Sequence, residues 1–260
     1  MGASALKSPR RERTRTKAMG VIVPVHNEED LLRVALEAID DASSLVTAIG
    51  IECRTAIMLD RCTDASEVIA RDWVRRLRHH GRAHQATVQT CQAVGVGNAR
   101  REGSLSLLRG WAGWKPRDIW LATTDADSRV PIDWLAAQLE AHEGGADIWT
   151  GRVAVEDWSL YEMRTERRWV EAYESEVAPI HGASLGFNAQ MYLDAGGFAS
   201  LDSGEDRALH GAIVALGGNT HVSSNVKVVT SGRRKARAPR GFSYALCTLD
   251  RDVTEEEKIA

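Results

Sequence analysis

The chain has 260 residues, of which 43% are hydrophobic and 27% are charged, and its formal net charge is −3 at pH 7. These values are typical of a soluble globular protein with one large domain or two small ones. The nearly balanced charge gives no strong basic field and excludes nucleic acid as the expected partner. Four scattered cysteines without a CxxC pair indicate neither a zinc site nor a disulfide framework, which fits a reducing cytosol.

The two ends of the chain are polar and charged. Residues 1–18 predict a disordered basic extension, since six of the first 17 residues are lysine or arginine, and residues 250–260 predict a loose acidic tail. No apolar run approaches the ~20 residues that span a bilayer, and the first residues lack a signal-peptide core. We therefore expect a cytoplasmic protein. The basic extension leaves open a peripheral contact with anionic lipid at the inner face of the membrane.

Strands and helices alternate through the first half. Apolar, β-branched runs predict strands at 19–25, 51–59, 86–90, 119–123 and 148–155. Apolar residues at helical spacing, with capping residues before them, predict helices that begin near Asn27, Thr63, Ala99 and Pro131. We expect Asn27 to cap the first helix, with acidic residues 28–30 in its first turn.

The second half is less regular. It predicts helices over 160–178, within 185–198 and over 206–216, and a strand at 226–230. Alternating strands and helices indicate an α/β fold with a mostly parallel central sheet and helices on both faces. We expect a single domain over residues 19–249. Ligands of such sheets bind beyond the carboxyl ends of the strands, where the polar loops 25–29, 60–64 and 124–128 follow predicted strands.

The most informative stretch is the apolar run 119–123 that leads into Asp125-Ala126-Asp127. Carboxylates are the ligands that Mg²⁺ and Mn²⁺ prefer, and such ions are commonly completed by the phosphates of a substrate. Asp125 and Asp127 therefore predict a divalent cation that bridges to a diphosphate. The alternative is a solvated turn after a strand, where aspartate is common.

Residues 95–100 contain two of the three glycines of a dinucleotide-binding motif. The third is replaced by Arg100, and the segment follows the third predicted strand instead of the first, so the motif does not hold. We interpret it as the opening of a helix whose N–H groups, with Arg100, meet a phosphate. An arginine on a helix with a flexible entry is the alternative.

Taken in chain order, these pieces resemble family-2 glycosyltransferases of the GT-A fold. The resemblance rests on residues 21–29, 60–64, 97–100 and 125–127, and on Gly186, Gly196-Gly197-Phe198 and Gly204-Glu205-Asp206. It covers roughly residues 19–232 and implies a GT-A-like domain. Residues 19–155 would then form the nucleotide-sugar-binding half and residues 156–249 the acceptor-side half.

The resemblance also implies roles for individual residues. The nucleoside would be held by Pro24, Asn27, Glu29 and Asp60. Asp125 would face the ribose and Asp127 the metal. Asp206 would be the catalytic base, with its neighbour Glu205 as the rival.

Two departures from the family pattern stand out. Arg61 lies in the turn after the second strand, where the family commonly has an acidic pair and Gly-Ser, and this change bears on the nucleobase. Many members place a metal-ligating histidine after the last strand, where this chain has residues 230–234 (Thr-Ser-Gly-Arg-Arg). Whether a histidine, such as His210 or His221, or instead Arg233 or Arg234 completes the site is open at this point.

On the acceptor side, His181 precedes the Gly186 segment. It either lines the acceptor pocket or is a loop histidine without a ligand. Trp169 and Tyr173 lie on a predicted charged helix. Aromatic faces stack on sugars, but at helical spacing a core stripe is the commoner explanation.

The predicted function is a glycosyltransferase of the hexosyltransferase type. It would move a sugar from a nucleoside diphosphate donor to an acceptor hydroxyl, with inversion and metal assistance. A nucleotidyltransferase is one alternative, but it would need a glycine-rich basic loop where the chain has residues 24–29. A non-catalytic sugar-nucleotide-binding protein is another, which the presence of Asp125, Asp127 and Asp206 together disfavours. The nucleobase, the sugar and the acceptor stay open.

Overall fold

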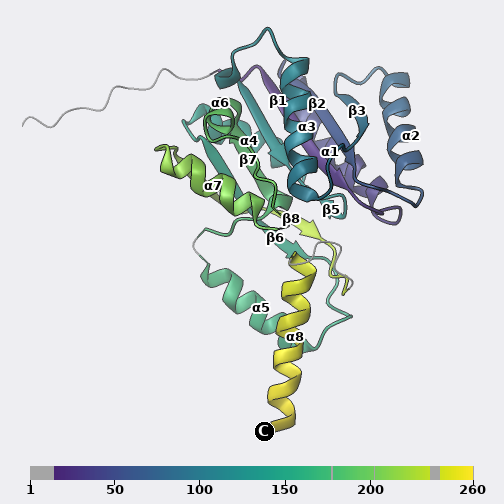
Figure 1. Ribbon diagram of the computed structural model, residues 1–260, viewed down its shortest axis with the longest axis vertical. Coiled ribbons are helices and arrows are strands. Elements are labelled where there is room, and N and C mark those ends of the chain that lie inside the picture. Colours follow the sequence, from purple (N-terminus) through teal and green to yellow (C-terminus); the bar gives the residue numbers. More distant parts are fainter. Residues whose placement is uncertain (1–14, 177, 202, 235–240, 260) are drawn as a thin grey trace, which may run out of the picture.

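The computed structural model describes residues 15–176, 178–201, 203–234 and 241–259. In these residues one eight-stranded sheet has the order β3-β2-β1-β4-β7-β6-β8-β5 (Figure 1). The strands are β1 (Ala18–Val25), β2 (Glu52–Leu59), β3 (Gln85–Thr90), β4 (Ile119–Thr123), β5 (Ser128–Arg129), β6 (Ile148–Val155), β7 (Leu185–Asn188) and β8 (Thr220–Thr230). The helices are α1 (Leu32–Ala48), α2 (Ser66–His79), α3 (Val96–Gly110), α4 (Trp134–Glu143), α5 (Met163–Ser175), α6 (Ala189–Asp194), α7 (Glu205–Ala215) and α8 (Phe242–Ile259).

The sheet is mixed but largely parallel, which confirms the predicted fold class. Strand β1 pairs in parallel with β2 and β4, β2 pairs in parallel with β3, and β6 with β8. Strand β7 runs antiparallel between β4 and β6, and the short β5 runs antiparallel to β8. The carboxyl ends of β1, β2 and β4 therefore meet at one edge of the sheet, as parallel pairing requires.

Helices cover both faces of the sheet. Along β1, Val21 and Val23 join a buried cluster with side chains of α1, α2 and α4, whereas Ile22 joins a second cluster with side chains of α3, α6 and α7. Successive strand residues point to opposite faces, so a strand buried on both sides is apolar throughout. This is why β1 appears in the sequence as a continuous apolar run.

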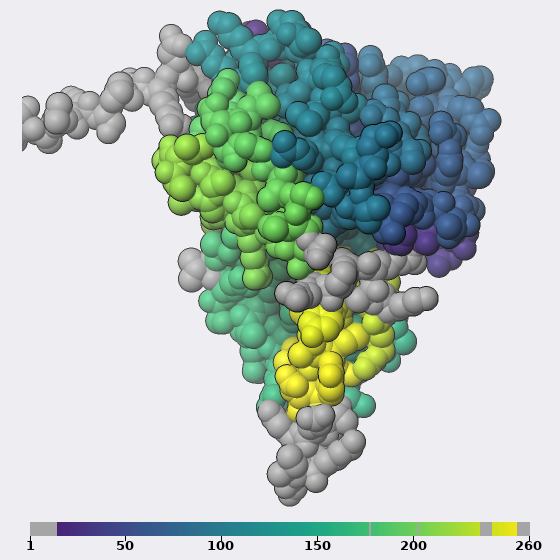
Figure 2. Space-filling model, in the orientation of Figure 1, coloured from purple at the N-terminus to yellow at the C-terminus, as the bar shows by residue number. Residues whose placement is uncertain are grey.

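Helices α5 and α8 pack against each other and form a lobe that extends from the body of the sheet (Figures 1 and 2). Asp250 of α8 is only 5% exposed. Its carboxylate accepts hydrogen bonds from Thr165 Oγ1 (2.7 Å) and Glu162 N (3.1 Å), and it pairs with Arg234 (2.7 Å). The loose tail expected over residues 250–260 is therefore wrong for 250–259, which continue α8.

The amino-terminal boundary also differs from the expectation. Strand β1 begins at Ala18, and Thr16 is buried with its hydroxyl 2.9 Å from His142 Nδ1. The backbone N–H of Lys17 donates to Asp118 O (2.9 Å). The extension predicted for residues 1–18 is thus wrong for residues 15–18, and residues 1–14 lie outside the described part of the chain.

The first helix begins later than predicted. Asn27 has a φ of 55°, which no α-helical residue adopts, and α1 begins at Leu32. The side chain of Asn27 instead accepts a hydrogen bond from Thr63 N (2.7 Å). The acidic residues 28–30 consequently lie in a loop above the sheet, where Glu28 is 6% exposed. None of the described helices is both long and apolar enough to cross a membrane.

Candidate functional site

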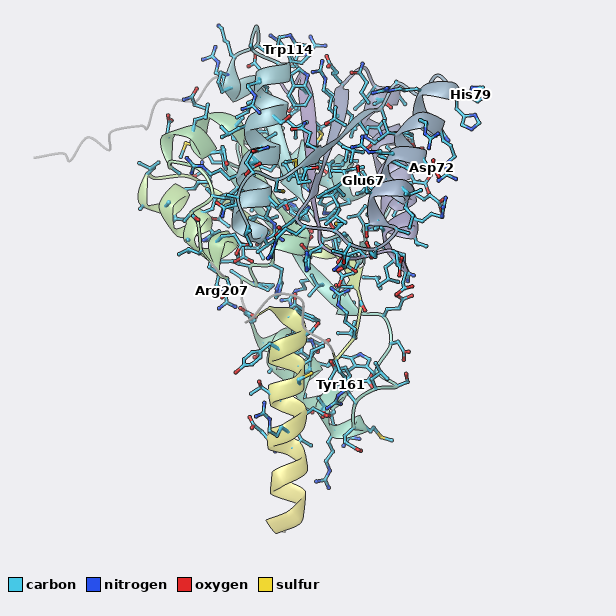
Figure 3. All side chains as sticks on the ribbon, turned by 45° about the vertical axis from the view of Figure 1, so that its right-hand side comes forward. Glu67, Asp72, His79, Trp114, Tyr161 and Arg207 are labelled. Carbon is cyan, nitrogen blue, oxygen red and sulfur yellow. The ribbon has the colours of Figure 1, made fainter. Side chains whose placement is uncertain are left out.

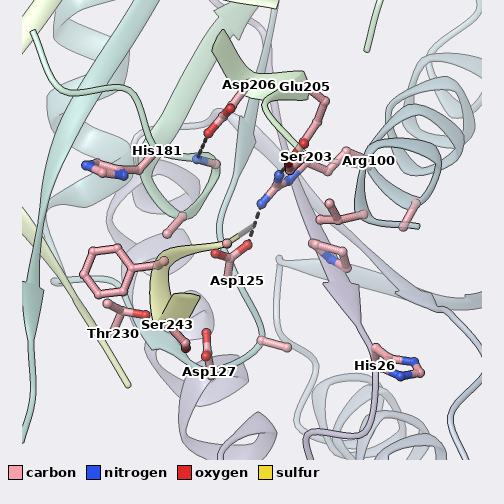
Figure 4. A pocket seen from close by; sticks show the side chains of 18 of the residues that line it. His26, Arg100, Asp125, Asp127, His181, Ser203, Glu205, Asp206, Thr230 and Ser243 are labelled. Carbon is pink, nitrogen blue, oxygen red and sulfur yellow. Dashed lines mark hydrogen bonds and ion pairs between the residues drawn. The ribbon is translucent and has the colours of Figure 1, made fainter. Parts of the chain in front are cut away.

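A cavity of about 680 Å³ lies at the carboxyl ends of β1, β2 and β4, the position at which parallel sheets bind ligands. Loops from these strands line one side. The starts of α7 and α8, with residues 180–183, line the other (Figure 4). Its volume is that of pockets that hold small molecules. The donor-side and acceptor-side halves predicted from the sequence therefore meet at this cavity.

The cavity wall contains most of the predicted site residues: Pro24, Asp60, Arg100, Asp125, Asp127, Glu205 and Asp206. Asn27 and Glu29 are not part of it. The carboxylate of Glu29 accepts a hydrogen bond from Ala65 N (2.9 Å), and its backbone N–H donates to Asp64 (3.0 Å). Both residues connect the loop after β1 to the loop after β2, so they support the cavity wall without lining the cavity.

Asp60 directly follows β2 at the cavity wall and is 7% exposed. One carboxylate oxygen accepts a hydrogen bond from Gly95 N (2.9 Å), and the other pairs with Arg61 (3.0 Å). Gly95 has a φ of 105° at the entrance to α3, a conformation that glycine adopts without strain. Asp60 thus joins the end of β2 to the start of α3.

Arg100 projects from the first turns of α3 into the floor of the cavity and is 4% exposed. Its guanidinium forms ion pairs with Asp125 (2.5 Å) and with Glu205, and it donates to Thr123 Oγ1 (3.0 Å). Burial lowers the pKa of Arg100, but the two carboxylates outweigh it and raise the pKa overall. A Cβ at Gly182 would clash with this guanidinium. Arg100 therefore binds the protein's own carboxylates, where the sequence predicted a contact with phosphate.

Glu205 and Asp206 start α7 but have different surroundings (Figure 4). Glu205 is 3% exposed and held by Arg100. Asp206 is half-buried at the cavity wall, where its carboxylate accepts hydrogen bonds from Gly182 N (2.8 Å) and Arg207 N (2.7 Å). Two backbone donors fix the direction of this carboxylate without neutralising its charge.

Asp127 lies deeper and is paired with Arg233, with 2.8 Å between Oδ2 and the guanidinium. The same guanidinium donates two hydrogen bonds to Glu28, at 2.7 and 2.8 Å. Burial raises the pKa of Asp127, while Arg233 opposes that rise. The sequence placed Glu28 in a helix turn and gave it no site role. No spacing signal links residues 205 positions apart.

These residues do not fit a divalent ion in the arrangement described. Asp125 is held by Arg100 and Asp127 by Arg233. In the described residues, no group of three or more His, Cys, Asp or Glu side chains is placed to hold a metal ion. His210 and His221 lie outside the cavity wall, and His210 contacts Thr220 Oγ1 (3.2 Å).

The cavity wall formed by the second half of the chain is aromatic and contains His181, Trp169 and Phe242. The rings of Trp169 and Phe242 meet edge to face at 5.0 Å, and Trp169 stacks on Tyr173 at 5.5 Å. The buried Nε2 of His181 has no hydrogen-bond partner among the described residues, and burial lowers the pKa of this ring.

Solved structures share this fold at low sequence identity. Staphylococcus aureus TarS 1–349 in complex with UDP is 16% identical with a TM-score of 0.57, over 83% of this chain and 61% of that chain. The mannosyltransferase PcManGT from Pyrobaculum calidifontis, in complex with GDP-Man and Mn²⁺, is 18% identical with a TM-score of 0.57, over 90% of this chain and 68% of that chain.

Glucosyl-3-phosphoglycerate synthase from Mycobacterium tuberculosis, in complex with Mn²⁺, UDP and glucosyl-3-phosphoglycerate, is 14% identical with a TM-score of 0.50 over 92% of this chain and 77% of that chain. This chain spans about 60% of the length of the TarS structure. A search of curated proteins gives no significant match.

The sequence itself matches the family described as Glycosyl transferase family 2 over residues 20–196. The match covers more than half of the chain and includes the loops after β1, β2 and β4 that line the cavity. The resemblance inferred from the motifs is thereby confirmed, and the chain belongs to glycosyl transferase family 2.

Proposed function

We propose that this protein transfers a sugar from a nucleoside diphosphate donor to an acceptor hydroxyl, with inversion at the anomeric carbon. The observation that carries the proposal is the position of Asp206. Its carboxylate forms no ion pair with an arginine among the described residues, and it lies on the wall of the cavity that Asp60, Asp125 and Asp127 line from the other side. A base opposite a donor site is the arrangement that hydroxyl activation needs.

The donor side of the cavity supports a nucleoside diphosphate. Pro24 lies at the end of β1, and Asp60 and Asp125 follow the neighbouring parallel strands β2 and β4. Carboxylates at such a rim bind the hydroxyl groups of a ribose. Two of the solved relatives are in complex with UDP and with GDP-Man. Which nucleobase this chain accepts is set by the loop with Asp60 and Arg61 in our proposal.

On the acceptor side, Asp206 would take the proton of the attacking hydroxyl as the new glycosidic bond forms. The backbone N–H groups of Gly182 and Arg207 hold its carboxylate in one orientation, so little reorganisation precedes the reaction. Trp169 and Phe242 offer aromatic surface, and the ring of His181 lies in the same wall. This combination suits a polyhydroxylated acceptor with an apolar face.

The divalent ion predicted at Asp127 and Asp125 stays a prediction for this chain. Mn²⁺ is recorded in two of the solved relatives, whereas here both carboxylates are held by arginines. The cytoplasmic location, and a peripheral contact of the basic first residues with the membrane, are likewise kept as proposals.

The function is tested by incubating the protein with a panel of nucleoside diphosphate sugars and measuring release of the nucleoside diphosphate. Asp206→Asn keeps the size of the side chain and removes its basicity. It should lower kcat by about 10²–10⁴-fold and leave donor affinity unchanged, because the base acts on the acceptor. Pyrophosphate release from a nucleoside triphosphate would instead identify a nucleotidyltransferase. Binding without turnover in the presence of acceptors would identify a non-catalytic binding protein.

A further inference from the structure

Arg233 is a second cation of the cavity that is held by two carboxylates. It forms an ion pair with Asp127 and a two-pronged pair with Glu28, and its side chain is 22% exposed. Both carboxylates are more deeply buried, at 8% for Glu28 and 11% for Asp127. Such a fork-shaped contact fixes the plane of the guanidinium. These contacts therefore fix the position of the Arg233 side chain in the site.

The guanidinium occupies the side of Asp127 that a metal ion would need. It lies 2.8 Å from Oδ2, while Oδ1 faces the hydroxyl of Ser128 at 3.3 Å. A Mg²⁺ ion binds carboxylate oxygen at about 2.0–2.1 Å, so an ion on Oδ2 would lie in close contact with a group of the same charge. Coulomb repulsion at such a distance is strong in a partly buried site.

Only one of the contacts of Arg233 would have to open to admit an ion. Its pair with Glu28 uses both terminal nitrogens, so Glu28 alone can retain the guanidinium beside the cavity. Its Nε is buried and has no hydrogen-bond partner among the described residues. The Asp127 contact is thus the one at which a guanidinium and an ion compete.

We propose that Arg233 is the resident counter-cation of Asp127, and that the guanidinium and a divalent ion exclude each other at this carboxylate. Arg233 then lies where many family members have a histidine that ligates the metal, and its guanidinium takes the place of the ion. This inference rests on the proposed function in one respect, the identity of the ligand. That ligand is a sugar donor whose diphosphate needs positive charge beside it. A guanidinium released from Asp127 would remain on Glu28 at the cavity wall.

The test is a titration with MnCl₂ alone, without nucleotide, followed by electron paramagnetic resonance of free Mn²⁺. The variants are Arg233→Met and the double variant Glu28→Gln/Arg233→Met, which avoids a second unpaired buried carboxylate if the single variant fails to fold. The control is Arg71→Met, which removes the same charge from an exposed pair with Glu67 on α2. Circular dichroism checks the fold of each protein.

We expect Mn²⁺ to bind the folded Arg233 variants more than about tenfold more tightly than the wild type or Arg71→Met. Adding Asp127→Asn to either variant should abolish the gain. Equal Mn²⁺ affinity in the wild type and the Arg233 variants would overturn the proposal, and so would a gain that survives Asp127→Asn. UDP and GDP binding is measured separately on the same proteins. If none of these proteins binds UDP or GDP, that result would count against the proposed function. The Mn²⁺ affinities would still test the exclusion at Asp127.

Discussion

Glu205 and Asp206 are neighbours in the chain, yet the structure gives them different environments. Glu205 is buried against Arg100, whereas Asp206 meets only backbone donors at the cavity wall. Adjacent residues of a helix point in directions about 100° apart, so one of the two faces the core and the other the ligand. This separation favours Asp206 as the base and Glu205 as a structural partner of Arg100.

Glu205→Gln should therefore act mainly on stability. It removes one charge from a buried pair and leaves Arg100 with Asp125 alone, which we expect to cost about 1–3 kcal/mol. Urea unfolding measures the loss, and kcat should fall far less than in Asp206→Asn. A stable Glu205→Gln protein without turnover, beside an active Asp206→Asn, would reverse the two roles.

His142 predicts a pH dependence of stability. Asn188 Nδ2 donates to its Nε2 at 2.9 Å, so the neutral ring carries its proton on Nδ1, next to Thr16 Oγ1. Burial lowers the pKa of His142 from 6.5 to about 4. Below pH 6.5 the ring of His142 binds a proton in the unfolded chain but not in the folded chain. The free energy of unfolding therefore falls as the pH drops toward 4. The full loss is about 3 kcal/mol.

Urea unfolding at pH 7, 5.5 and 4.5 measures this contribution. His142→Gln should be less stable at pH 7 and should flatten the dependence over this range. His79→Gln, at an exposed ring on α2, is the matched control and should keep the wild-type slope. An unchanged slope in His142→Gln would assign the pH dependence to other groups.

At the scale of elements, the contact between α5 and α8 depends on Asp250. This carboxylate is shared by Thr165, the N–H of Glu162 and Arg234. Asp250→Ala removes an acceptor of two hydrogen bonds and an ion pair, and we expect faster amide hydrogen exchange in α5 and α8 with little change in the sheet. Asp252→Ala, two residues along and exposed, is the control and should leave exchange unchanged. Equal protection in both variants would show that apolar contacts alone hold the lobe.

Some elements could be predicted from sequence and others could not, for physical reasons. The ranges 119–123 and 148–155 predicted from the sequence have the bounds of β4 and β6, because most residues of these two strands are apolar and buried. Helix α8 was missed. It packs mainly on α5, and of its described side chains three, those of Leu246, Asp250 and Val253, are buried. The first half of β8 was also missed, since residues 220–222 and 224–225 are exposed and polar patterning hides the strand.

The site shows the same division. Asp60, Asp125 and Asp127 could be predicted because parallel strands bring their carboxyl ends to one edge. The partners of those carboxylates could not, because Arg100 and Arg233 reach them from distant parts of the chain. A pattern of residue types shows which charges a site contains but not which of them neutralise each other.

At the scale of the whole molecule, two truncations test which part of the amino-terminal segment contributes to stability. Deleting residues 1–14 should leave stability and turnover on a soluble acceptor unchanged, because the described contacts of β1 begin after them. Deleting residues 1–17 should lower stability by about 1–2 kcal/mol, since it removes Thr16 from His142 and Lys17 from Asp118. Thermal unfolding distinguishes the two truncations. A destabilised 1–14 deletion would contradict this division.

Arg100 is shared by two loops with different tasks, one that ends in Asp125 and one that begins α7 beside Asp206. A ligand that displaces Asp125 would change the ion pair between the guanidinium and Glu205. Asp206, the proposed base and the neighbour of Glu205, would then move as well. We expect occupancy of one half of the cavity to change the affinity of the other half, and thermodynamic linkage makes such an effect equal in both directions. We therefore expect the two substrates of the proposed reaction to bind cooperatively, coupled through the single buried side chain of Arg100.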